Sequence, residues 1–383
     1  MEAESAYRRH GTLRVMSLWL DGEQRVYPPL DRDVTADVVV VGAGIAGIAT
    51  AYFLASTGAK VVVLEARGVA EAASGRNAGF LLAGVAENFV AASRRYGERH
   101  ALRIWHFTRR TQALARSLVA ENGIECDLRW NGSDQIAGDE EEWSEIAESA
   151  KRLASEGIAV SVDPAKRTAT YAEDGELHPV RWVRGLAAAA VSKGARIHES
   201  TRVRAIGAGE ALTASGVVRA GTIVLCTNAY TAHLATSRVR PVRGQMLATA
   251  PTAPVFARPA YANRGYRYWR QTSDGRALVG GWRDTAAALE VGEEERTTAV
   301  IQDQLEAFLR ARGVAAAVTH RWAGTMGFSH DALPYVGAIA SGVFVCGGFT
   351  GHGMAFGPAA AELVASLVRG ATHPDADLFD PSR

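Results

Sequence analysis

Three glycines at positions 42, 44 and 47 have the spacing of a loop that binds phosphate. They follow the apolar run "DVVVV" (37–41) and begin an apolar stretch that ends at Gly58. A strand, a glycine turn and a helix in this order place backbone N–H groups and the positive end of the helix dipole against a phosphate. Gly42 would form the tight turn, Gly44 would let the backbone approach a pyrophosphate, and Gly47 would let the helix pack on the strand.

An acidic residue completes this pattern. The next apolar segment, "KVVVLEA", carries Glu65, which lies 18 residues after Gly47. In a dinucleotide-binding βαβ unit, the carboxylate at this place accepts a hydrogen bond from a ribose hydroxyl. Glutamate rather than arginine disfavours a ligand with a 2′-phosphate. The pattern leaves both FAD and NAD open.

A second glycine-rich turn, "CGGFTGHGMAFGP", occupies residues 346–358, and an apolar helix is expected from Pro358. Such a turn before a helix also suits an anion. His352 lies within it, between two glycines. It could act as a base only with a substrate proton within reach. We favour a contact with the cofactor over proton transfer.

Charge and cysteine usage exclude several classes of protein. The chain has 42 basic and 41 acidic residues, a net charge of +1, so its overall charge does not favour nucleic acid or anionic lipid. Its cysteines, Cys126, Cys226 and Cys346, lie far apart without a CxxC pair. This spacing argues against a disulfide framework and against a zinc or iron–sulfur site.

Two segments bear on where in the cell the protein is located. The first 15 residues lack the long apolar core of a signal peptide. Residues 38–55 form an uncharged run of 18, the lower limit for a membrane span. The glycine spacing explains that run without a membrane. We therefore expect a cytoplasmic protein with no membrane contact.

The order of strand-like segments predicts the architecture. "GARIHESTRVRAI" (194–206), "GTIVLCTNAY" (221–230) and "GVFVCGG" (342–348) return the chain to the first sheet, whereas residues 238–336 are strand-like and aromatic around one helix near 293–312. An NAD dehydrogenase usually reads its ligand with one uninterrupted fold, so this layout favours the larger FAD. We predict an α/β fold: a discontinuous, Rossmann-like FAD-binding domain with an inserted, mainly antiparallel α+β substrate domain. The expected ranges are 1–85, 180–237 and 330–383 for the first, and 86–179 and 238–329 for the second. Long helices are expected over 86–122 and 139–157.

The motifs together resemble a known family. "VVVVGAGIAGIATAYFLA", "AASGRNAGF", "GTIVLCTNAYT", "WAGTMGFSHDALPYVG" and "GGFTGHGMAFGP" occur in the order seen in the flavin-dependent family of D-amino acid oxidase, glycine oxidase and sarcosine oxidase. The resemblance covers residues 35–370 and is nearest to the γ-glutamylputrescine oxidase branch. It implies FAD, hydride transfer to flavin N5 from a carbon α to nitrogen, an imine that hydrolyses, and reoxidation by O2.

The resemblance also implies which residues hold FAD. The first turn would hold the ADP half, the "SGRN" segment would pass beside the pyrophosphate and flavin, and the last turn would lie under the isoalloxazine. The implied set is Gly42, Gly44, Ile45, Ala46, Gly47, Glu65, Ala66, Arg67, Ser74, Gly75, Arg76, Asn77, Val203, Thr227, Asn228, Asp331, Gly348, Thr350, Gly351, His352, Gly353 and Met354.

The chain departs from its relatives where they bind flavin covalently or grip a substrate carboxylate. No cysteine lies between 227 and 345, so FAD should be non-covalent. Met326 replaces the arginine, and Ala355 the lysine, that relatives use for the carboxylate. No lysine follows position 193, so the lysine used for oxygen activation is also missing. Candidates for catalysis and substrate contact are His352, Met354, Arg270 and Trp282, with Arg283 and Arg321 as further anion clamps and Tyr266, Tyr268 and Trp269 as pocket walls.

Three functions remain open on these residues. The first is oxidation of an amine or an N-substituted amino acid. The second is a flavin-carrying dehydrogenase subunit that passes electrons to a partner. The third is a D-amino acid or glycine oxidase with a relocated carboxylate-binding arginine. A flavin-binding module without turnover is a further alternative. The expected partners are a small amine and O2 or another electron acceptor, with no nucleic acid and no metal, in a monomer or homo-oligomer.

Overall fold

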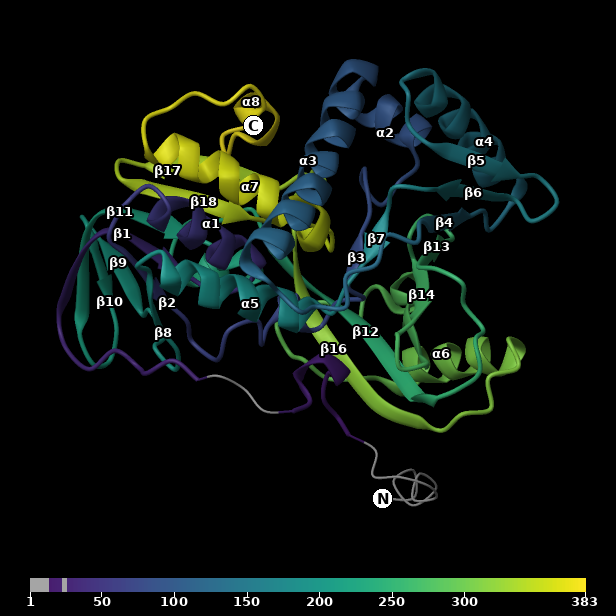
Figure 1. Cartoon of the computed structure of the whole chain (residues 1–383), viewed down its shortest axis with the longest axis horizontal. Coiled ribbons are helices and arrows are strands. Elements are labelled where there is room, and N and C mark those ends of the chain that lie inside the picture. The colour runs from purple at the N-terminus through teal and green to yellow at the C-terminus, as the bar shows by residue number, and fades with distance from the viewer. Residues whose placement is uncertain (1–13, 23–25) are drawn as a thin grey trace.

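The structure is a computed structural model that describes residues 14–22 and 26–383. Two eight-stranded sheets form its framework (Figure 1). The first sheet has the order β17-β18-β11-β1-β2-β8, with β10 and β9 continuing from β11. Its strands are β1 (Val34–Val41), β2 (Val61–Leu64), β8 (Arg196–His198), β9 (Ala205–Gly207), β10 (Glu210–Leu212), β11 (Val217–Leu225), β17 (Tyr335–Ala340) and β18 (Val343–Gly347).

The centre of this sheet is parallel because its strands are apolar on both faces. Val39 of β1 lies opposite Ile223 of β11 and Val62 of β2, and all three are fully buried. Continuous apolar runs of this kind suit a strand covered on both sides. Helices α1 (Ile45–Ala55), α5 (Pro179–Ser192) and α7 (Gly353–Val368) cover one face, with α3 (Glu98–Asn122) and the short α8 (Ala376–Phe379) packed against α7.

The second sheet is antiparallel except for one pair. Its order is β16-β12-β15-β14-β13-β4-β6-β5, and only β13 and β4 run parallel. One face packs on α6 (Ala299–Ala311) through a core that includes Leu247, Val279 and Leu305. The strands are β4 (Ser133–Ile136), β5 (Val160–Asp163), β6 (Thr168–Tyr171), β12 (Arg240–Pro251), β13 (Ala260–Ala262), β14 (Arg267–Gln271), β15 (Arg276–Gly281) and β16 (Val318–Phe328).

Short elements join these layers. A two-stranded sheet pairs β3 (Phe80–Leu81) with β7 (Gly175–Glu176). Helices α2 (Phe89–Tyr96) and α4 (Glu140–Ser155) pack together on the side of the second sheet that carries β4 to β6 (Figure 1). In the described part of the chain, 3₁₀ turns span Leu18–Leu20, Ala73–Gly75, Asn228–His233 and Arg283–Ala286.

Two predicted helix boundaries are corrected. The helix expected over 86–122 is two helices, because Gly97 has φ +83° and ends α2 before α3 begins. The last helix begins at Gly353 rather than at Pro358, so the second glycine turn runs directly into its first turn. Pro358 lies inside α7.

The strands of the two sheets fall within the two sets of ranges expected from the sequence, and we propose the domain division on that basis. Helix α3 packs on α7 and α5 as well as on α2, so the division by sequence cuts across one packed layer. Within 14–22 and 26–383, no helix is long and apolar enough to cross a membrane. Most of the segment used to argue against a signal peptide lies outside the described residues.

Candidate active site

A cavity of about 1120 Å³ opens between the two sheets. Its lining includes the carboxyl-terminal ends of β1 and β2, at Val41 and Leu64, and Cys226 just after β11. This edge of a parallel sheet is where α/β proteins bind ligands. Residues of β12, β14 and β16 line the cavity from the second sheet, and the first turn of α7 closes one end. The volume exceeds the ~300–1,000 Å³ typical of small-ligand pockets, so there is room for an extended ligand.

The first glycine turn forms a close-packed floor. Gly42 has φ +102°, and a Cβ there would lie 2.8 Å from the Cys226 carbonyl oxygen. A Cβ at Gly47 would lie 1.9 Å from the Gly42 oxygen, so Gly47 serves helix packing and does not line the cavity. A Cβ at Gly44 would approach within 2.9 Å of Ser74 Oγ. Only glycine lets the backbone come this close.

Glu65 organises the same turn. Its carboxylate accepts hydrogen bonds from Ala43 N at 2.7 Å and Arg67 N at 2.8 Å. Burial raises the pKa of Glu65, and these two bonds oppose that rise. The Arg67 guanidinium pairs with Glu295 at 2.9 Å, and Arg76 pairs with the same carboxylate at 3.1 Å.

Side chains from outside the "SGRN" segment fix it by donating hydrogen bonds to its backbone carbonyl groups and to those of the two residues that follow. Ser17 Oγ donates to Gly75 O at 2.6 Å, Trp322 Nε1 to Arg76 O at 2.9 Å and Trp19 Nε1 to Asn77 O at 2.7 Å. Arg270 Nη1 donates to Ala78 O and Gly79 O, at 3.1 and 3.2 Å. Each carbonyl from 75 to 79 thus receives a side-chain donor from outside the segment. The result is a rigid wall built on a segment with little regular structure.

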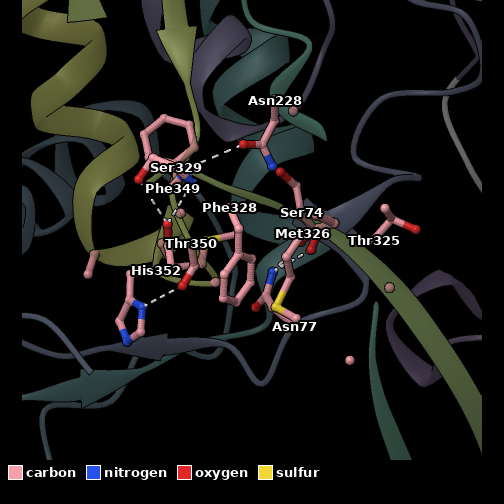
Figure 2. A pocket seen from close by; sticks show the side chains of 18 of the residues that line it. Ser74, Asn77, Asn228, Thr325, Met326, Phe328, Ser329, Phe349, Thr350 and His352 are labelled. Carbon is pink, nitrogen blue, oxygen red and sulfur yellow. Dashed lines mark hydrogen bonds between the residues drawn. The ribbon is translucent and has the colours of Figure 1, made fainter. Parts of the chain in front are cut away.

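The second glycine turn is fixed by side chains of neighbouring elements (Figure 2). Asn228 Oδ1 accepts from Gly348 N at 2.9 Å and from Phe349 N. Ser329 Oγ lies 3.2 Å from Thr350 Oγ1, and Thr350 adopts φ +50°. A positive φ at a threonine costs energy and persists only where its surroundings impose it.

The two glycine turns meet at one cavity. A Cβ at Gly357, in the second turn of α7, would lie 3.0 Å from Ile45 Cγ2 at the start of α1. The beginnings of α1 and α7 therefore lie side by side, and both line the cavity. Neither N-cap residue caps its helix with its own side chain, although Ser74 Oγ accepts from Ile45 N, the first N–H of α1, at 2.9 Å. The positive ends of both helix dipoles are available to negative charge on a ligand.

His352 faces the cavity with one nitrogen unused (Figure 2). Its Nδ1 lies 3.1 Å from Thr350 O, which places the proton on that nitrogen if the ring is neutral. Its Nε2 is buried and has no hydrogen-bond partner among the described residues. Burial lowers the pKa of His352, so the ring is neutral at pH 7 and Nε2 is an acceptor. An unpartnered buried acceptor is unfavourable in the free protein and suits a ligand donor.

Most residues predicted to hold the cofactor line this cavity. Those that do are Gly42, Gly44, Ile45, Ala46, Glu65, Ala66, Arg67, Ser74, Arg76, Asn77, Val203, Thr227, Asn228, Thr350, Gly351, His352, Gly353 and Met354.

Four do not. Gly47 and Gly75 are packing positions, since a Cβ at Gly75 would lie 2.1 Å from Ala70 O. Gly348 belongs to the second glycine turn but does not line the cavity. The Asp331 carboxylate also lies outside the lining and pairs with Arg383 at 2.7 Å.

Two predicted catalytic residues lie elsewhere and are corrected. Arg270 is 2% exposed and forms an ion pair with Glu176 at 2.7 Å, outside the cavity lining. Trp282 adopts φ +59°, which turns its ring away to pack 5.3 Å from Phe308 behind the second sheet. Trp269 lies on that same side, 4.7 Å from Phe308. Arg321 pairs with Glu306 and bonds to Gln302.

An aromatic wall faces the second glycine turn. Tyr261 lies 6.2 Å from the His352 ring and 5.9 Å from Tyr268, and Phe80 lies 5.4 Å from Tyr261. Of these, only Tyr268 was expected. Phe328 and Met326 also line the cavity from β16. The alternation in "GTMGF" is a period-2 signal that puts 324, 326 and 328 on one face once that segment is known to be a strand.

Comparison with known proteins identifies the fold. Residues 37–367 match the DAO family, described as FAD dependent oxidoreductase. The chain belongs to this family. It is 27% identical over 402 residues to the probable oxidoreductase OrdL of Haemophilus influenzae, covering 95% of this chain and 90% of that one. It is also 27% identical over 381 residues to the gamma-glutamylputrescine oxidoreductase of Escherichia coli, covering 92% and 87%.

A solved structure agrees. Glycine oxidase from Geobacillus kaustophilus superposes with a TM-score of 0.78 at 24% identity, covering 92% of this chain and 99% of that one. The predicted fold class, family and cofactor are thereby confirmed, and the chain is an FAD-dependent oxidoreductase.

The residues of the cavity fit FAD. Gly42 and Gly44 line the cavity at the start of α1, where a pyrophosphate binds, and a Cβ at either would collide with Cys226 O or Ser74 Oγ and displace the turn. The unpartnered Nε2 of His352 and the uncapped start of α7 lie in the second turn of the same cavity. The described residues contain no group of three or more His, Cys, Asp or Glu side chains arranged to hold a metal ion.

Proposed function

We propose that the protein oxidises a small amine, or an amino acid, at the carbon bonded to nitrogen, and that the product imine is hydrolysed. FAD, when bound, supplies the hydride acceptor at flavin N5. The observation that carries the proposal is the aromatic wall of Tyr261, Tyr268 and Phe80 opposite the His352 turn. Aromatic faces attract an ammonium group and orient an amine.

In this reaction, the residues of the chain orient the substrate and stabilise negative charge. The wall holds the amine against the second glycine turn, which supplies proximity without a strong acid or base. The first turn of α7 stabilises negative charge at the end of the cofactor that it faces. His352, neutral at Nε2, can accept a hydrogen bond from a donor in the cavity. Its role as a cofactor contact remains part of this proposal.

The binding roles of the lining residues are likewise proposed. The first turn with Glu65 would hold the ADP half, Val203 and Thr227 would flank it, and the 350–354 turn would contact the flavin ring. Similarity to the gamma-glutamylputrescine oxidoreductase supports an amine as substrate. A cytoplasmic location is proposed as well.

The decisive experiment is anaerobic reduction of the bound flavin. The purified holoenzyme is mixed with a panel of amines and amino acids without oxygen, and loss of the visible flavin band is followed. Bleaching by an amine is the expected result. No bleaching across the panel would contradict the proposal and favour a flavin-binding module without turnover.

Admission of air to the bleached enzyme identifies the electron acceptor. None of the four lysines lines the cavity, so no ammonium group is placed there to assist O2. Rapid recovery of the band would support O2 as acceptor. Slow recovery that an artificial electron carrier accelerates would favour the dehydrogenase that passes electrons to a partner.

We expect FAD to leave the protein on acid denaturation. Cys346 is fully buried and outside the cavity lining, and Cys226 lines the cavity beside Gly42 rather than in the second turn. The measurement is flavin absorbance in the supernatant and pellet after acid precipitation. Yellow colour retained in the pellet, and lost from it in Cys226→Ser, would show a covalent link.

We expect His352→Gln to leave the pH dependence of kcat/KM unchanged. Because burial lowers the pKa of His352, its ring is already neutral across the working range and does not titrate there. The rate constant itself should fall about 10-fold or less, because glutamine can still accept a hydrogen bond. A pH–rate profile of both proteins is the measurement. Loss of a limb with a pKa near neutrality in the variant would instead make His352 the base.

A further inference from the structure

Met326 occupies the position in β16 at which the family resemblance places an arginine for the substrate carboxylate, and the arginine that β16 does carry, Arg321, pairs with Glu306. Among the arginines that line the cavity, Arg283 comes from another element. Arg283 begins the 3₁₀ turn after β15 and lines the cavity. Its guanidinium lies 5.0 Å from the Tyr266 ring and 4.9 Å from the Phe328 ring. These two contacts with aromatic rings fix the position of the Arg283 guanidinium group.

The charge of Arg283 is not neutralised by the protein. Among residues 14–22 and 26–383, no carboxylate pairs with Arg283, which is half-buried. The adjacent acid, Asp284, pairs with Arg267 instead. The other half-buried arginines of the lining, Arg67 and Arg76, share Glu295. Exposed lining arginines such as Arg202 remain in solvent. A half-buried guanidinium without a carboxylate has up to five unused donors aimed at a ligand.

The backbone before Arg283 accounts for its direction. Gly281 has φ +114° and Trp282 has φ +59°. A left-handed conformation at a tryptophan is strained and persists only where the surrounding structure imposes it. It turns Trp282 behind the sheet, against Phe308, and the next side chain toward the cavity.

The position of Arg283 relative to the second glycine turn indicates which kind of ligand it would bind. A Cβ at Gly351 would lie 3.2 Å from Met326 Sδ, so Met326 contacts the turn. Phe328 lies two residues later on the same face of β16, and its backbone pairs with Phe349 at the start of the turn. Arg283 stacks over the Phe328 and Tyr266 rings, so it reaches the cavity from the end of β15 and not from the position of Met326. Its charge also reaches Tyr268: burial raises the pKa of Tyr268 to about 12, and Arg283 opposes that rise.

We propose that Arg283 determines specificity by binding a distal carboxylate of the substrate. On this view the substrate is an amine whose carboxylate lies several bonds from the oxidised carbon, rather than an α-amino acid. The aromatic wall receives the amine end and Arg283 the acid end. This inference rests on the proposed amine oxidation, and it names the substrate class for the same cavity.

The test compares acids with matched amides. The substrates are 4-aminobutyrate, 5-aminopentanoate, the amide of each, butylamine and glycine, with wild type, Arg283→Gln, Arg283→Lys and Arg312→Gln. The control residue Arg312 stacks between Trp269 and Phe308, at 5.1 and 4.7 Å, but lies outside the cavity lining. A charge-assisted hydrogen bond lost without replacement corresponds to about a 10- to 100-fold change.

Wild type should favour a distal acid over its amide by about that factor. Arg283→Gln should lower kcat/KM for the acid by the same factor and leave the amide unchanged, whereas Arg283→Lys should retain part of the preference. Arg312→Gln should behave as wild type. A preference that survives in Arg283→Gln, or a wild type that does not distinguish acid from amide, would overturn the proposal.

A binding measurement separates this inference from the proposed function. Pentanoate, which has no amine, should perturb the visible flavin spectrum of the holoenzyme, and Arg283→Gln should raise its Kd about tenfold or more. If no amine bleaches the flavin but pentanoate binds through Arg283, the amine reaction is wrong and the anion site stands. Equal binding of pentanoate to wild type and Arg283→Gln would remove the anion site alone.

Discussion

Arg270→Met is expected to lower the free energy of unfolding by about 3–5 kcal/mol. Arg270 is 2% exposed, its partner Glu176 is 1% exposed, and their charged groups lie 2.7 Å apart. Removing the arginine leaves a buried carboxylate with the half-exposed Arg129 as its charged partner and Asn131 as a hydrogen-bond donor. It also removes the donor from Ala78 O and Gly79 O, where the cavity wall is fixed.

The expected consequence for the site is indirect. Burial lowers the pKa of Arg270 to about 10, yet the group stays charged at pH 7 and holds the 78–79 backbone in place. We therefore expect thermal unfolding at a lower temperature and a smaller share of bound FAD, with little change in KM for the enzyme that retains FAD. Differential scanning fluorimetry and the flavin-to-protein absorbance ratio are the measurements.

A double variant is the control. In Arg270→Met with Glu176→Leu, no fully buried charge is left unpaired, because the remaining Arg129 is half-exposed, so stability should recover in part. A single variant as stable as wild type, with a KM raised strongly for the substrate, would return Arg270 to the role of a substrate contact.

Gly42→Ala is expected to weaken FAD binding by about 100-fold or more. The new Cβ would lie 2.8 Å from the Cys226 carbonyl, where no flexible side chain can give way, and φ +102° is itself unfavourable for alanine. Strain of about 1–3 kcal/mol for such a conformation, added to the contact, moves the turn that faces the pyrophosphate. About 1.4 kcal/mol corresponds to a tenfold change in Kd.

Gly58→Ala provides the matched control. Gly58 has φ +88° at the end of the same βαβ helix, but a Cβ there would meet nothing within 4 Å. Both variants carry the backbone cost, and only Gly42→Ala carries the contact. Kd of FAD for the apoprotein, measured by recovery of flavin absorbance, should change little in Gly58→Ala. Equal loss in both would mean that helix stability, and not the shape of the turn, limits binding.

The first glycine turn could be predicted because its chemistry is local. Gly42, Gly44 and Glu65 lie within one βαβ unit, and the strands that frame them are apolar runs whose pairing needs no other information. The close contacts at Gly42 and Gly47 are the physical reasons for those glycines. The family and FAD followed from these motifs and are confirmed by the match over residues 37–367.

The arginines could not be ranked from the sequence. Arg270, Arg283 and Arg321 all lie in or next to strands of the second sheet, and each was a candidate for an anion. Arg270 finds Glu176, which comes from 94 residues earlier in the chain, and Arg321 finds Glu306 on α6. Of these three, Arg283 alone lines the cavity, and no carboxylate of the described residues pairs with it. Whether an arginine is available to a ligand therefore depends on whether a carboxylate of the chain pairs with it, which the residue type alone does not reveal.

The sequence by itself determined the cofactor turn and the family, because glycine spacing and apolar runs act through the nearby backbone. Only the tertiary structure decided the substrate end. There, the direction of each side chain depends on contacts between distant segments, such as Asn228 with Gly348 and Arg283 with Phe328, and on the left-handed turn at Trp282. Long-range packing sets these directions, and no local pattern records it.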